Sequence, residues 1–175
     1  MAQYASILMI AIPVFMVLIL IEYLISIKMG MKVIRSLDTI SSLSSGMTNV
    51  IKSVLGLAVG IISYEWMLTT FSIVTFKAEI FHFAIAFIAL DFAGYWSHRW
   101  EHVINIFWNR HIIHHSSEEY NLACALRQNI SVVFLYFTFL LFPAALLGVP
   151  VEVIGIVAPL HLFAQFWYHT RLIDR

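Results

Sequence analysis

Five apolar runs dominate this chain, and each approaches the roughly 20 residues that a helix needs to cross a bilayer. They cover residues 4–27, 50–76, 80–96, 131–149 and 151–168. Charged residues make up only 11% of the 175 residues, against about a quarter in soluble proteins. Backbone groups inside lipid must be hydrogen-bonded within the chain, which favours helices. The sequence therefore predicts an all-α, polytopic membrane helical bundle.

The last two runs are joined so briefly, at Gly148 and Pro150, that they must form a hairpin. Two full spans there give five in all, and a re-entrant hairpin is the alternative. With five spans, three groups of basic residues share one face, which the positive-inside rule makes cytoplasmic. These residues are Lys28, Lys32, Arg35, Arg99, Arg110, Arg127, Arg171 and Arg175. We expect the first run to remain as an anchor, because no cleavable signal is evident.

Charge and cysteine content exclude several classes of function. The formal net charge is zero, so nothing indicates nucleic-acid binding. A single cysteine, Cys124, rules out an internal disulfide framework. The sequence does not fix an oligomeric state.

Five histidines lie in the polar segment that follows the third run. They are His98, His102, His111, His114 and His115. Residues four or three apart share a face of a helix, as His98 and His102 do, and His111 and His114. Imidazole is the commonest metal ligand, and five exceed the three or four protein ligands of one zinc ion. The pattern predicts a site for two ions at the cytosolic face, with iron, zinc, copper or nickel all suited to nitrogen ligands.

Three other interpretations are open. His98 to His102 matches H-x-x-E-H, the inverted zinc-peptidase signature, in which Glu101 would be the general base. Otherwise Glu101 faces solvent or pairs with Arg99 or Arg110. A bis-histidine haem protein is disfavoured, because the histidines cluster at one surface. A non-enzymatic membrane protein is the third.

The segments "DFAGYWSHRWEH" and "HIIHHSSEEYNLACALRQ" resemble the first two histidine boxes of the fatty acid hydroxylase/sterol desaturase superfamily. The segments "HHSSEEYNLACALRQ", "QFWYHT" and "RSLDTISSLSSG" are most similar to its alkylglycerol monooxygenase branch and the bacterial relatives of that branch. The resemblance implies a non-haem di-iron centre that uses dioxygen to hydroxylate or desaturate a lipid in the bilayer. The implied ligands are His98, His102, His111, His114, His115 and His169. An electron donor is also implied, and the branch suggests a reduced pterin.

The resembled family has a further H-x-x-H-H box downstream, and this sequence stops before it. We therefore expect residues 1–79 to form N-terminal spans and a first loop, and residues 80–175 to form an incomplete hydroxylase-like domain. We also expect this chain alone to be a C-terminally truncated, incomplete catalyst.

Several polar residues outside the histidine boxes are candidates for a role near the metal site. Asp91, inside the third run, is expected to hold a histidine from another helix as an outer partner of the metal site. Asn121, Arg127 and Gln128 are expected to order the second box, or to contact a lipid headgroup or the electron donor.

Other charged or imidazole side chains are expected to play no part in metal binding. Glu118 and Glu119 fall in a predicted solvated loop. His82 precedes His98 by about 24 Å along a helix, at the opposite membrane face. His161 lines a substrate path or bridges two helices.

Overall fold

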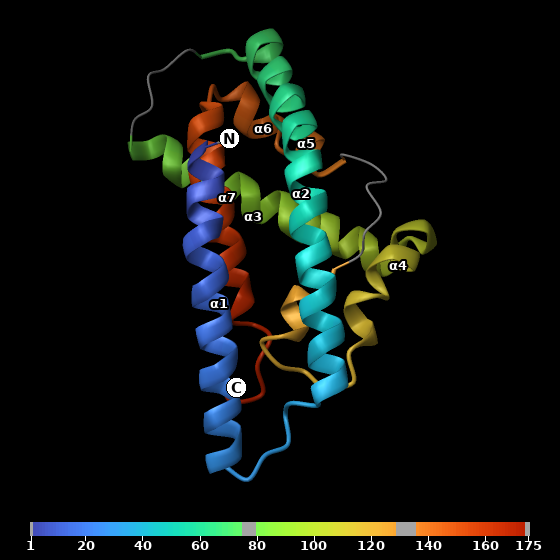
Figure 1. Cartoon of the computed structure of the whole chain (residues 1–175). Coiled ribbons are helices and arrows are strands. Elements are labelled where there is room, and N and C mark those ends of the chain that lie inside the picture. Colours follow the sequence, from blue (N-terminus) through green and yellow to red (C-terminus); the bar gives the residue numbers. More distant parts are fainter. Residues whose placement is uncertain (1, 75–79, 129–135, 174–175) are drawn as a thin grey trace.

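The computed structural model of this chain describes residues 2–74, 80–128 and 136–173 (Figure 1). All regular structure in these ranges is helical, which confirms the all-α part of the predicted fold class. The elements are α1 (Ala2–Lys28), α2 (Ser36–Phe71), α3 (Ile80–Val103), α4 (Asn105–His111), η1 (His114–Ser116), η2 (Cys124–Leu126), α5 (Tyr136–Leu140), α6 (Phe142–Leu146) and α7 (Val151–Phe166).

Two of the described helices are long and apolar enough to cross a membrane. They are Met9–Lys28 in α1, with a mean hydropathy of 2.6, and Ile80–Val103, with a mean hydropathy of 1.4. The apolar helix α7 is shorter, at 16 residues. These helices support a membrane location, and the five-span count stays a prediction.

The structure of the fourth apolar run, residues 131–149, differs most from the prediction. Part of it lies outside the described residues, and the rest forms two helices of five residues each, α5 and α6. Pro143 sits in the first turn of α6, where the missing N–H costs nothing, but a helix cannot continue through it unbroken. The described part of this run is therefore not one continuous span.

Helix α2 begins earlier than the sequence predicted. The second apolar run begins only at residue 50, yet α2 starts at Ser36, in the Ser-rich stretch before that run. Two of its hydroxyls find partners without a loop. Thr48 donates to the Ser44 carbonyl at 2.9 Å, and Ser45 donates to the Gln128 carbonyl at 2.6 Å. At 36 residues, α2 is about 54 Å long and exceeds the roughly 30 Å of a hydrocarbon core.

The main apolar core lies between α2, α3 and the C-terminal helices. Small residues allow close approach: Ala86 and Ala93 of α3 and Ala144 and Ala145 of α6 are fully buried. Gly148 ends α6 with a positive φ of 73°, and a Cβ there would collide with the Val74 carbonyl oxygen. Only glycine suits this turn.

A second, smaller core joins α1 to α7 and to the loop that follows the second histidine box. Its buried members are Ile19, Leu122, Ala123 and Phe166. Phe15 and Phe166 pack with ring centroids 4.6 Å apart, and α1 and α7 lie side by side (Figure 1). This packing brings the chain just after α7, which carries His169, against that loop.

Candidate metal centre

The first two histidines lie at the end of a membrane helix. Helix α3 continues without a break to Val103, so His98 and His102 sit on its last turns. Their Nε2 atoms are 2.9 Å apart and their rings are stacked. The prediction that these two residues share one helix face is therefore confirmed.

The next two histidines approach from the other side of a tight turn. The chain leaves α3, passes Ile104 and forms α4, which ends at His111. His111 and His115 face each other, with Nε2 atoms 3.0 Å apart. The sequence predicted instead that His111 and His114 share a helix face. The short 3-10 turn of η1, after the end of α4, brings His115 into the space instead.

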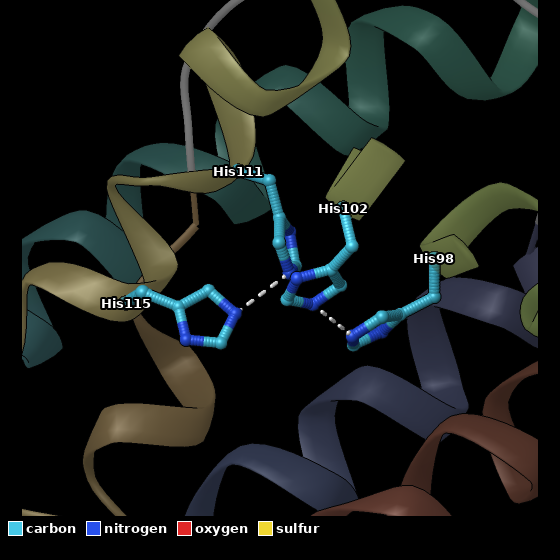
Figure 2. A group of neighbouring side chains, drawn as sticks. All are labelled: His98, His102, His111 and His115. Carbon is cyan, nitrogen blue, oxygen red and sulfur yellow. Dashed lines mark hydrogen bonds between the residues drawn. The ribbon is translucent and has the colours of Figure 1, made fainter. Parts of the chain in front are cut away.

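These four side chains form one cluster, which we call the four-histidine cluster: His98, His102, His111 and His115. One ligand atom from each lies within 4.8 Å of every other. Figure 2 shows the rings pointing toward one another from α3 on one side and from α4 and η1 on the other.

The remaining two predicted ligands form a pair beside this cluster. The Nε2 atoms of His114 and His169 are 3.2 Å apart. Nδ1 of His114 bonds the Arg127 carbonyl at 3.0 Å, and Nδ1 of His169 bonds the Gln165 carbonyl at 3.3 Å. A carbonyl accepts, so both Nδ1 atoms carry the proton and both Nε2 atoms are left as electron-pair donors.

The two groups are continuous with each other. The ring centroids of His111 and His114 are 5.3 Å apart, and those of His114 and His115 are 5.4 Å apart. The structure therefore brings together all six histidines that the sequence proposed.

Burial keeps several of these rings neutral. It lowers the pKa of His114 to about 4, and the nearby imidazoles act in the same direction. Burial, chiefly, also lowers the pKa of His115 and of His169. At neutral pH these rings hold the uncharged form that a metal requires.

The spacing of the nitrogens suits a metal ion. Two nitrogen ligands at about 2.0–2.1 Å from one ion lie roughly 2.9–3.4 Å apart. The Nε2 separations of 2.9 Å and 3.0 Å in the four-histidine cluster fall in this range. The donor set contains nitrogen only, which suits iron, zinc, copper or nickel.

The Glu101 carboxylate contacts the ring of His111 on the side that faces away from the cluster. Its Oε2 lies 3.1 Å from Nδ1 of His111, and its side chain is 19% exposed. The sequence expected Glu101 to face solvent, to pair with an arginine, or to act as a general base. Its carboxylate instead contacts the His111 nitrogen that faces away from the cluster, as in the carboxylate–histidine–metal arrangement. No local signal indicated this pair, because the turn between α3 and α4 creates it.

Arg127 lies at the centre of a buried polar network behind His114. Its guanidinium bonds the Asp38 carboxylate at 2.6 Å, with side chains 8% and 9% exposed. Burial tends to raise the pKa of the Asp38 carboxyl, but hydrogen bonds from Ser117 and the Glu118 amide, with the Arg127 charge, lower it overall. This network fixes the backbone whose carbonyl orients His114.

The other predicted outer residues order the same loop. Nδ2 of Asn121 donates to the Val33 carbonyl at 2.6 Å, and the Gln128 amide donates to Ser45 at 3.0 Å. Asn121, Arg127 and Gln128 thus tie the second box to α2 and to the segment between α1 and α2.

Two acidic residues differ from expectation. Asp91 contacts a histidine from another helix, but that residue is His161 of α7, at 3.3 Å, which lies outside the six-histidine array. His161 precedes His169 by about 12 Å along the helix direction. Glu119, expected in a solvated loop, is 9% exposed and pairs with Arg35 and Arg171.

Comparison with known proteins gives a consistent result. A family model described as fatty acid hydroxylase matches residues 83–175. Alkylglycerol monooxygenase of Homo sapiens is 33% identical over 166 residues, which are 94% of this chain and 37% of that protein. Alkylglycerol monooxygenase of Danio rerio is 35% identical over 165 residues, 93% of this chain and 36% of that protein. The chain thus spans little more than a third of these curated relatives, and no solved structure matches it.

Proposed function

The chain belongs to the fatty acid hydroxylase family, and from this premise we propose that it acts as a membrane-bound, non-haem di-iron oxygenase that hydroxylates or desaturates a lipid. The single observation that supports this most is the convergence of four imidazoles within 4.8 Å at the end of an apolar helix. We place this site at the cytosolic face of the membrane.

The six histidines would hold the two irons. The four-histidine cluster would bind one ion, and His114 with His169 would contribute to the other. Iron bound there would activate dioxygen, the oxidant, for attack on an unactivated C–H bond, which is chemistry that acid–base side chains lack.

The protein's own groups orient these ligands, and an aromatic ring covers one side of the cluster, in which His98, His102 and His115 are exposed. Glu101 holds His111 through Nδ1, and the Arg127 carbonyl holds His114 in the same way. The ring of Trp108 packs 5.7 Å from the His102 ring and 5.7 Å from the His115 ring, which places an apolar wall beside the cluster. Excluding water protects a reactive oxidant.

The substrate would approach along the bilayer. Because α3 is long and apolar enough to cross a membrane and carries His98 and His102 on its last turns, a lipid chain in the bilayer would reach the site without crossing water. The similarity to alkylglycerol monooxygenases leads us to propose an ether lipid, with dioxygen and an electron donor such as a reduced pterin as co-substrates.

Metal analysis tests this proposal. The protein is purified in detergent, and iron and zinc per chain are measured by mass spectrometry of the metals. We expect iron in the wild type and a sharp loss in His102→Ala and His114→Ala. His161→Gln, which alters a histidine outside the array, is the matched control and should keep its iron.

Activity is then measured by product mass after incubation with an alkylglycerol, a reduced pterin and dioxygen. Zinc in place of iron, with hydrolysis of the lipid instead of oxidation, would contradict the proposal. Equal iron loss in His161→Gln and His102→Ala would contradict the ligand assignment.

A further inference from the structure

The geometry points to Glu22, in the first membrane helix, as a positioning residue for the His114–His169 pair. This inference rests on the proposed function, because it concerns the second of the two metals. It also gives the N-terminal helix, which lies outside the matched residues 83–175, a part in the metal centre.

Glu22 is buried among backbone and hydroxyl groups. It is 2% exposed, although it lies within the span Met9–Lys28. Its Oε2 accepts the Leu122 amide N–H at 2.8 Å, and its Oε1 accepts the Thr170 hydroxyl at 2.6 Å. Placing a carboxylate in an apolar helix is costly, so a charged residue there usually has a defined partner. The two partners, Leu122 and Thr170, lie in segments that are far apart along the chain.

Both partners are next to histidines of the pair. Thr170 directly follows His169, and its hydroxyl also accepts the Leu172 amide at 3.2 Å. Leu122 belongs to the loop that ends at Arg127, whose carbonyl bonds His114. One carboxylate therefore holds together the two segments that present His114 and His169 to each other.

Two neighbouring contacts also join these two segments. The Tyr120 hydroxyl donates to the Tyr168 carbonyl, and Arg171 bonds Glu119 at 3.2 Å. Each of these two contacts has an exposed member, Tyr120 or Arg171, although Glu119 is buried. Glu22 is 2% exposed, and it approaches from α1 rather than from the loop itself.

The test uses Co²⁺, whose visible absorption reports nitrogen ligation, with the full chain in detergent. Co²⁺ should bind wild type in two steps, of which His169→Ala removes one. Glu22→Ala and Thr170→Val should weaken that same step roughly 10- to 100-fold, as loss of an outer hydrogen-bonding partner does, and leave the other step unchanged. Glu22→Gln should retain most of the affinity, because its amide oxygen can accept from Leu122 while its N–H donates to Thr170.

Matched controls come from α2. Glu65 is an exposed carboxylate in a helix, and the Thr69 hydroxyl donates to the Glu65 and Trp66 carbonyls of that same helix. Glu65→Gln and Thr69→Val should bind Co²⁺ as the wild type does.

A metal-independent measurement separates this inference from the proposed function. Hydrogen exchange of the peptide that covers residues 168–173 should accelerate in Glu22→Ala and not in Glu65→Gln, whether or not metal binds. A wild type that binds no Co²⁺ overturns the proposed function, while the exchange result still decides the role of Glu22. Wild-type exchange and affinity in Thr170→Val, or in folded Glu22→Ala, would overturn the inference, as would equal weakening of both Co²⁺ steps.

Discussion

Replacement of Arg127 by alanine should be among the most damaging single changes in this chain. Its guanidinium donates to the Asp38 carboxylate at 2.6 Å, to Ser42 at 3.1 Å and to Ser116 at 3.1 Å. Removing it leaves Asp38 buried with hydrogen bonds from Ser117 and a backbone amide as the remaining compensation. Breaking a buried pair in this way costs about 3–5 kcal/mol. Arg127→Lys keeps the charge but loses the fork of donors, so it should recover about half of that energy.

The loss is measured as a fall in melting temperature of the purified protein. For a chain of this size, 1 kcal/mol corresponds to about 2–4 °C, so Arg127→Ala should melt at least roughly 6 °C lower. Arg99→Ala is the matched control, because Arg99 is exposed and its contact with the Tyr95 hydroxyl is long, at 3.4 Å. If both alanine variants melt within 2 °C or so of the wild type, the reasoning about the buried pair is refuted.

Three further predictions concern single residues. Glu101→Gln should lower metal affinity roughly 10- to 100-fold by loosening His111, measured by competition with a chelator, and unchanged affinity would argue against the positioning role. Gly148→Ala should destabilise the protein by about 2 kcal/mol or more, because alanine would have to adopt a positive φ and its Cβ would collide with the Val74 carbonyl oxygen. Gly155→Ala, whose Cβ would meet open space, should not destabilise it. Equal melting temperatures of the two variants would contradict this prediction. Wild type should have a larger free energy of unfolding than Asp38→Asn at pH 7, and this difference should shrink as the pH falls below about 4. The reason is that a carboxyl whose pKa is lowered in the folded state stabilises the protein only while it is ionised. A difference that does not change with pH would exclude this linkage.

Features set by local periodicity were predictable from the sequence. Residues four apart in a helix share a face whatever the surrounding fold, so the His98–His102 pair followed from spacing alone. The same holds for apolar runs long enough to span a bilayer, as the first and third runs are. The motif resemblance then added His169, which no local pattern connects to the others.

Features set by tertiary contacts were not predictable in this way. Serine and threonine compete with helix formation, which favours a loop before residue 50. Helix α2 nevertheless starts at Ser36, and within it the Thr48 hydroxyl finds a partner in the helix and the Ser45 hydroxyl finds one beyond η2. Glu22, Asp38 and Glu101 each depend on a partner brought close by folding. The sequence alone does not show which group each of these carboxylates contacts.

The continuity of α3 has a consequence for how such a protein can adapt to bilayers of different thickness. Each residue in a helix adds about 1.5 Å and turns the next side chain by about 100°. One residue inserted before His98 would therefore swing His98 and His102 away from His111, although it would raise them only slightly. Seven inserted residues make nearly two full turns, so the same face would return to the site about 10 Å farther along the axis. The height of the metal centre above the bilayer can thus change only in large steps, and finer adjustment must come from helix tilt.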